Sequence, residues 1–188
     1  MGRLMVVGSA LLGDGTILRM IVWINGAFGA GKTTTAGLLT KRLDGAKLFD
    51  PEYVGYMLMP FVESPTGDFQ DLPLWRRLVI ETMAGLAQQY PHPWVAPMSL
   101  INAAYRAEIL GGLRGAGVDV REFVLAVPED RLRARIDADE VDVKARRWRH
   151  DHVSQALATF AALTDATFVD GSPPAEQVAE VVLEQVRG

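Results

Sequence analysis

The chain has 188 residues, of which 49% are hydrophobic and 22% are charged, and its formal net charge is −4. That length suits one well-packed domain rather than two, and the apolar content is that of a folded protein. The acidic balance and the lack of a long basic block argue against a nucleic-acid partner. The sequence has no cysteine, which excludes disulfides, thiolate metal sites and cysteine nucleophiles.

Residues 1–19 precede the first strong strand pattern and include an apolar patch over Leu4–Leu12. Gly13-Asp14-Gly15 follows this patch without a convincing cleavage site, which argues against a targeting segment. We expect an N-terminal extension here: an extra strand, an arm, or residues upstream of a natural start at Met20. Every apolar run falls well short of the ~20 residues of a membrane span, so we expect no transmembrane segment. Together with the absence of cysteine, this favours a cytoplasmic protein.

From residue 20 onward, short β-branched runs alternate with longer helical patterns. We expect five strands, over Met20–Asn25, Lys47–Asp50, Trp94–Met98, Val118–Val127 and Ala166–Val169. The helical patterns cover Lys32–Leu43, Leu74–Gln89, Ala104–Gly115, Glu129–Ala138, His152–Leu163 and Pro174–Val186. This alternation predicts one α/β domain over residues 20–188, with a parallel sheet covered by helices on both sides. Residues 60–74 are expected to form a surface excursion, and residues 137–149 either a lid or a solvated helix face.

The first predicted strand is followed by Gly26-Ala27-Phe28-Gly29-Ala30-Gly31-Lys32-Thr33, which matches the P-loop (Walker A) pattern G-x-x-x-x-G-K-[ST]. Its glycines allow close backbone approach, so that N–H groups converge on phosphate oxygens at the positive end of a helix. Lys32 is expected to bind the β- and γ-phosphates, and the Thr33 hydroxyl to bind Mg²⁺. Thr34 either contacts the α-phosphate or only helps to begin the helix. The motif therefore predicts an ATP site with Mg²⁺.

Asp50 is expected to act with Lys32 in catalysis. It ends the second predicted strand, and parallel strands lie ~4.8 Å apart, so an acid two strands from the loop lies ~10 Å from it. This separation suits an acceptor hydroxyl that faces the γ-phosphate. Asp50 would orient or deprotonate that hydroxyl, or hold a magnesium-bound water. The alternative is that Asp50 only caps a helix beginning at Pro51.

Three further side chains are candidates for substrate binding. Phe69 and Trp75 would line a base or sugar pocket, and Arg76 would hold an anionic or polar substrate. Burial is the alternative for the two aromatic residues, and a solvated helix face is the alternative for Arg76. The third predicted strand ends without an acid, and no Asn-Lys-x-Asp pattern occurs, which argues against motor or switch ATPases and GTPases.

The chain resembles the ATP-binding tunicamycin resistance protein family among the P-loop kinases and, more distantly, chloramphenicol phosphotransferase. The resemblance rests on residues 21–33, Asp50-Pro51-Glu52, Asp68-Phe69-Gln70, Pro73-Leu74-Trp75-Arg76 and Val95-Ala96-Pro97-Met98. It implies a kinase-like three-layer α/β/α fold with strand order 2-3-1-4-5, ATP binding, and phosphorylation or sequestration of a nucleoside antibiotic. The chain departs from the family at Asp137 and Asp139, near positions where arginine is usual.

The sequence therefore predicts a Mg-ATP-dependent phosphotransferase that acts on a hydroxyl of a small molecule, with tunicamycin as a candidate. Two alternatives remain open. One is an ATP-dependent protein that binds and sequesters an antibiotic without phosphoryl transfer, and the other is a nucleotide kinase. The sequence also leaves open whether the chain forms a homodimer.

Overall fold

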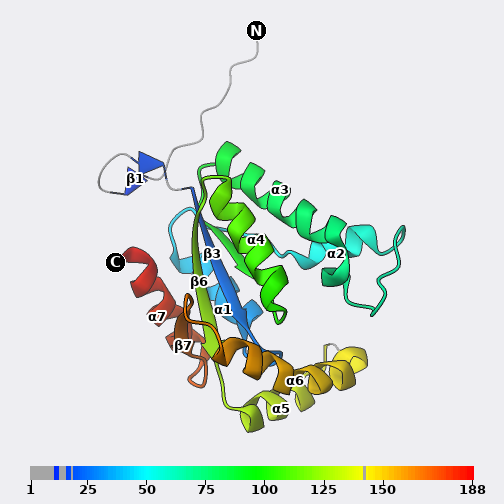
Figure 1. The fold of residues 1–188 in the computed structure, drawn as a ribbon. Coiled ribbons are helices and arrows are strands. Elements are labelled where there is room, and N and C mark those ends of the chain that lie inside the picture. Colours follow the sequence, from blue (N-terminus) through cyan, green and yellow to red (C-terminus); the bar gives the residue numbers. More distant parts are fainter. Residues whose placement is uncertain (1–10, 13–15, 18, 142) are drawn as a thin grey trace.

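The computed structural model describes residues 11–12, 16–17, 19–141 and 143–188. The predicted extension over residues 1–19 lies mostly outside these ranges. Two short pieces of it are described: β1 (Leu11–Leu12) pairs antiparallel with β2 (Thr16–Ile17), apart from the main sheet (Figure 1). The domain boundary at residue 20 stays a prediction.

Five parallel strands form the central sheet, in the order β4-β5-β3-β6-β7. Their bounds are β3 (Met20–Gly26), β4 (Lys47–Leu48), β5 (Trp94–Pro97), β6 (Asp119–Ala126) and β7 (Thr167–Asp170). Numbered along the chain from β3, this order is 2-3-1-4-5, so the predicted topology is confirmed. All seven residues of β3 are buried, because this strand has neighbours on both edges and helices on both faces.

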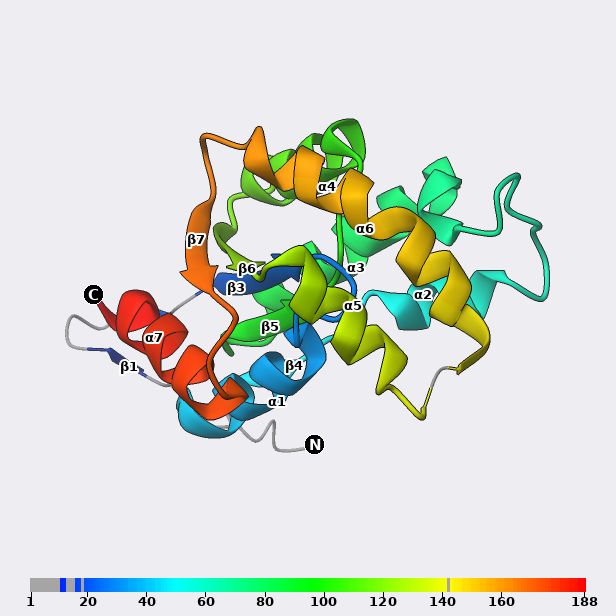
Figure 2. The same cartoon turned by 90° about the horizontal axis from the view of Figure 1, so that it is seen from below.

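The two faces of the sheet carry separate hydrophobic cores. Alternate residues of β3 point to opposite faces, so Val22 and Ile24 join one core while Ile21 and Trp23 join the other. The first core includes α1 (Lys32–Arg42), α5 (Glu129–Asp137), α6 (Arg146–Ala161) and α7 (Ala175–Arg187). The second includes α2 (Glu52–Leu58), α3 (Pro73–Gln89) and α4 (Ala103–Gly115). Figures 1 and 2 show the resulting three layers.

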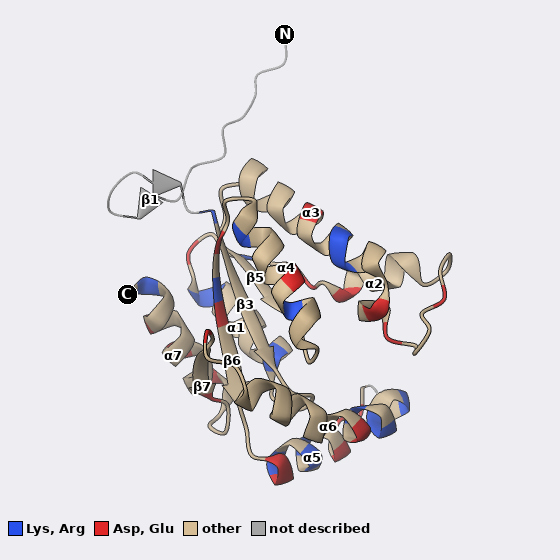
Figure 3. Cartoon of the chain, in the orientation of Figure 1, with Lys and Arg blue, Asp and Glu red and all other residues tan. Residues whose placement is uncertain are grey.

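Two helices differ from the sequence-based expectations. Helix α2 is absent from the predicted helical patterns and was foreseen only in the alternative that Asp50 caps a helix beginning at Pro51, because its seven residues are too short for a clear helical period. Helix α6 begins at Arg146 rather than His152, so the second half of the stretch 137–149 is a turn, η2 (Val143–Ala145), followed by the start of a helix. That start is strongly charged and lacks an apolar stripe. Figure 3 shows how charged residues gather over α5 and the first half of α6.

No helix in the described ranges combines the length and the apolar character that a membrane crossing requires.

Candidate functional site

The segment from the end of β3 to the start of α1 contains three glycines with positive φ, of which Gly29 and Gly31 lie at the turn into the helix. Gly29 has φ 82°, and a Cβ atom there would lie 2.7 Å from the main-chain oxygen of Leu132. Gly31, with φ 91°, is the left-handed residue directly before α1. These conformations turn the chain from the strand into the helix, so that the first N–H groups of α1 face the loop. Such N–H groups have no partner within the helix, and they lie at its positive end.

A buried polar network fixes the start of the loop. Asn25 Oδ1 accepts hydrogen bonds from the N–H groups of Gly26 and Leu100, both at 2.9 Å. Asn25 Nδ2 donates to Glu122 Oε1 at 2.8 Å, and Glu122 in turn forms a buried ion pair with Arg106. These bonds tie the loop to the end of β5, to β6 and to α4. Sequence reasoning missed this network, although a glutamate within the apolar strand pattern of residues 118–127 was its visible signal.

Lys32 is held at the mouth of the loop. Its Nζ donates to the main-chain oxygen of Ala27 at 3.0 Å and lies 5.6 Å from the centroid of the Phe28 ring. Burial lowers the pKa of Lys32 to about 8; Arg149 adds to this effect, whereas Glu52 and Asp50 oppose it. No ion pair joins Lys32 to a carboxylate within the described residues. An ammonium in this setting is suited to bind an anion.

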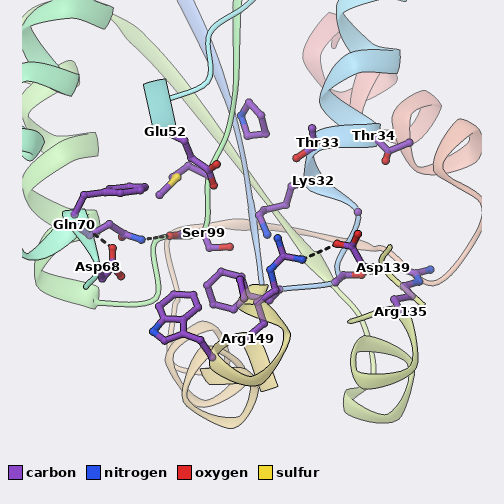
Figure 4. Close-up of a pocket in the computed structure, with 18 of the residues that line it drawn as sticks. Lys32, Thr33, Thr34, Glu52, Asp68, Gln70, Ser99, Arg135, Asp139 and Arg149 are labelled. Atoms are coloured by element: carbon purple, nitrogen blue, oxygen red, sulfur yellow. Dashed lines mark hydrogen bonds and ion pairs between the residues drawn. The ribbon is translucent and has the colours of Figure 1, made fainter. Parts of the chain in front are cut away.

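A cavity of about 800 Å³, called the inner cavity below, opens in front of the loop (Figure 4). Lys32, Thr33 and Thr34 reach it from α1, and Glu52 and Asp68 approach from the opposite side. The other lining residues include Phe28, Phe69, Gln70, Met98, Ser99, Arg135, Asp139, Trp148 and Arg149. This volume lies in the range of ~300–1,000 Å³ that is usual for small-molecule sites.

Three carboxylates lie on the far side of this site. Asp50 is half-buried, and its Oδ1 accepts a 3.0 Å hydrogen bond from the N–H of Glu52, the first residue of α2. Burial raises the pKa of Asp50, although this hydrogen bond opposes the shift. Asp68 Oδ1 accepts from the N–H of Gln70 at 2.9 Å, and burial raises the pKa of Asp68 as well. Glu52 and Asp68 line the inner cavity, whereas Asp50 is not among its described lining residues.

The three predicted substrate residues do not all reach the inner cavity. Phe69 lines the inner cavity, and its ring packs on Trp75 with the ring centroids 5.2 Å apart. Trp75 is fully buried and donates from Nε1 to the main-chain oxygen of Pro51 at 3.3 Å. Arg76 pairs with Glu108 at 2.6 Å and stacks over the Tyr105 ring at 4.1 Å. Trp75 and Arg76 are absent from the described lining and support the wall from behind.

Two arginines reach the inner cavity from α5 and α6, and sequence spacing did not single them out. Arg135 donates to the main-chain oxygen of Gly171 at 3.1 Å and approaches that of Gly29 at 3.4 Å. Arg149 pairs with Asp139 at 2.6 Å (Figure 4). Among the residues that the structure describes, no group of three histidine or acidic side chains is arranged to hold a metal ion.

Comparison with solved structures identifies the family. The structure of the Deinococcus radiodurans tunicamycin resistance protein is 30% identical to this chain, with a TM-score of 0.74, and the match covers 89% of this chain and 95% of that one. The chain belongs to the tunicamycin resistance protein family. The resemblance read from the sequence is thereby confirmed.

More distant structures share the fold of this tunicamycin resistance family member. A sugar kinase from Janibacter sp. HTCC2649 is 21% identical, with a TM-score of 0.62 over 89% of this chain and 94% of that one. The Mycobacterium tuberculosis APS kinase in complex with AMPPNP and APS is 18% identical, with a TM-score of 0.60 over 90% and 98%. The fold is therefore that of the P-loop kinases. No protein-family model and no curated protein matches the chain.

Proposed function

We propose that this tunicamycin resistance family protein is a phosphotransferase that moves the γ-phosphoryl group of ATP to a hydroxyl of a small molecule. The observation that carries the proposal is the inner cavity, which has a phosphate-binding type of loop on one side and two carboxylates, Glu52 and Asp68, on the other. The fold shared with sugar and APS kinases supports the same reaction class.

The loop residues fit a nucleotide triphosphate. Residues 26–34 would surround the phosphates with main-chain N–H groups, and Lys32 would place its ammonium between the β- and γ-phosphates. The partly buried ammonium, with no carboxylate salt bridge in the described ranges, is a group that gains from an added anion. The Thr33 hydroxyl is exposed at the cavity and would hold Mg²⁺, which supplies charge neutralisation when it is bound. Thr34, next on α1, would contact the α-phosphate.

A carboxylate on the far side of the inner cavity would take the proton of the acceptor hydroxyl. In the transfer, the acceptor oxygen forms a bond to the γ-phosphorus while the bond from that phosphorus to the β,γ-bridging oxygen breaks, and ADP leaves. The hydroxyl proton passes to a carboxylate, for which we propose Asp50: its burial and raised pKa suit a base. Glu52 is the rival, because it lies in the cavity lining and Asp50 does not. Phe69 would contact the acceptor, with Trp75 and Arg76 supporting it.

We propose tunicamycin as the acceptor to test first, because the Deinococcus radiodurans relative is named a tunicamycin resistance protein. ADP release is measured with Mg-ATP in the presence and absence of tunicamycin, for the wild type and for Lys32→Ala. Acceptor-dependent ADP release that Lys32→Ala abolishes supports the proposal. ADP release that tunicamycin does not accelerate argues against phosphoryl transfer to it.

The second candidate function is sequestration of the antibiotic without transfer. The absence of Asp50 from the described lining of the inner cavity favours it, because phosphoryl transfer would then depend on Glu52 or Asp68 to accept the proton. This candidate predicts binding of one tunicamycin per chain with no phosphorylated product.

A further inference from the structure

A second cavity, of about 400 Å³, adjoins the inner cavity and is called the outer cavity below. The two share Thr66, Asp68, Gln70 and Trp148 as lining residues, so they meet along one wall. The rest of the outer cavity comes from elements distant in sequence: Asp71 near α3, Tyr105 at the start of α4, and Gln155 on α6. A molecule that fills the inner cavity therefore has room to extend past Asp68.

The outer cavity offers both hydrogen-bond donors and acceptors. Asn102 Oδ1 caps α4 by accepting from the N–H groups of Ala104 and Tyr105, so its NH₂ group is left to donate. Asp68 uses one oxygen for the Gln70 N–H, and its second oxygen has no hydrogen-bond partner in the part of the chain that is described. Gln155 is exposed at the rim and carries a further amide. A ligand rich in hydroxyl groups would match this mixture.

The charge of the outer cavity excludes a phosphorylated ligand. Asp68 and Asp71 both line it, and the described lining contains no lysine or arginine. Arg76 lies against the Tyr105 ring, with its guanidinium bonded to Glu108 and to the main-chain oxygen of Gln70. The remaining group that can carry a positive charge there is His152, whose Nδ1 lies 2.7 Å from the main-chain oxygen of Trp148. A phosphate would face two carboxylates without a fixed cation.

An aromatic wall completes the outer cavity. Trp148 packs edge-on against Phe28, with the ring centroids 4.9 Å apart. Its other ring neighbour is His152, in a tilted contact with the centroids 4.2 Å apart. These contacts fix the indole in place where it borders both cavities. An apolar ring beside carboxylates and amides suits a group with one apolar face and a hydroxylated edge.

We propose that the outer cavity binds a polyhydroxylated, uncharged or cationic part of the acceptor, such as a glycosyl unit. The hydroxyl to be phosphorylated would then lie in the inner cavity, between Lys32 and Asp68. This inference rests on the proposed function for the role of the inner cavity. It also favours glycosides over nucleotides as acceptors.

The test uses calorimetric binding of tunicamycin, a glycosylated nucleoside, to the full chain saturated with AMPPNP and Mg²⁺. Gln155→Trp places a large ring at the rim of the outer cavity without removing a described hydrogen bond. Gln177→Trp, at an exposed position of α7 outside the cavities, is the matched control. We expect Gln155→Trp to weaken tunicamycin binding at least 10-fold and leave the affinity for AMPPNP unchanged, and Gln177→Trp to change neither.

Three results would overturn the inference: no binding of tunicamycin by the wild type, an unchanged Kd in Gln155→Trp, or tighter binding of uridine 5′-monophosphate than of uridine. The outcomes also separate this inference from the proposed function. Binding that Gln155→Trp weakens, without any phosphorylated product, leaves the outer cavity supported and contradicts phosphoryl transfer. Phosphorylation of tunicamycin with the same KM in Gln155→Trp and wild type would support phosphoryl transfer and contradict the role of the outer cavity.

Discussion

The guanidinium of Arg76 donates a 2.6 Å hydrogen bond to the main-chain oxygen of Gln70. The Gln70 side chain donates to the main-chain oxygen of Ser99, and the Ser99 hydroxyl donates to that of Gly26. A continuous set of hydrogen bonds therefore runs from α3, through the turn beside Asp68, to the start of the phosphate loop. It holds the two sides of the inner cavity at a fixed separation.

Arg76→Met tests this relationship. It removes buried hydrogen bonds and leaves Glu108 without its partner, so we expect the free energy of unfolding to fall by about 1–3 kcal/mol in urea denaturation. The KM for the acceptor should rise more than the KM for ATP. Arg77→Met is the control, because Arg77 is exposed and its ion pair with Glu81 is long, at 3.7 Å. The free energy of unfolding of this variant should stay within about 0.5 kcal/mol of the wild type. Equal effects of both variants would contradict the account.

Lys32→Met should stabilise the ligand-free protein while abolishing nucleotide binding. Folding lowers the pKa of Lys32 from 10.5 to about 8, so the charged lysine destabilises the fold below pH 8. Between pH 8 and 10.5 the unfolded chain binds more protons, and the stability of the wild type rises with pH. Urea denaturation at pH 7 should show Lys32→Met more stable by about 1–3 kcal/mol, with a smaller difference at pH 10. A variant less stable than the wild type at pH 7 would refute this.

Asp50→Asn and Glu52→Gln separate the two proposed bases. If Asp50 accepts the proton, Asp50→Asn should lower kcat by about 10²–10⁴ and Glu52→Gln by less than about 10-fold. Because burial raises the pKa of Asp50, kcat/KM should fall as the pH drops through a value above the usual 3.8. Steady-state rates of both variants and a pH profile of the wild type check this. The opposite order of effects would assign the base to Glu52.

Gly29→Ala should destabilise the protein and abolish nucleotide binding by the phosphate loop. The added Cβ would lie 2.7 Å from the main-chain oxygen of Leu132, at a φ of 82° that alanine adopts only with strain, so we expect a loss of about 1–3 kcal/mol in stability. AMPPNP binding, measured by calorimetry, should be lost. Gly37→Ala in α1 is the control: its Cβ meets nothing within 4 Å, and it should stabilise the helix by about 0.5–1 kcal/mol. Wild-type AMPPNP affinity in Gly29→Ala would show that the loop tolerates the change.

The fold was predictable because its signals are local. The fully buried strand over residues 20–26 begins with the continuous apolar run Met20–Ile24, and the glycine pattern that follows specifies a turn into a helix. Helix α2 is too short to show a helical period, and the start of α6 was missed because contacts with α5 stabilise it. His150, near the start of α6, accepts a hydrogen bond from Arg133 of α5 through its main-chain oxygen.

The far side of the site was less predictable than the loop. Arg76 was expected to contact substrate, but spacing along α3 does not reveal that Glu108, 32 residues away, pairs with it. Glu52 was not among the predicted site residues, and it is both the first residue of α2 and part of the cavity wall. Such roles depend on how separate elements meet.

The central claim is phosphoryl transfer from ATP to a hydroxylated small molecule in the inner cavity. The most direct measurement is mass spectrometry of tunicamycin after incubation with Mg-ATP and the purified protein. The account predicts a product heavier by one phosphoryl group, formed by the wild type and absent with Lys32→Ala. Bound tunicamycin recovered with unchanged mass from a wild-type protein that binds ATP would contradict it and favour sequestration.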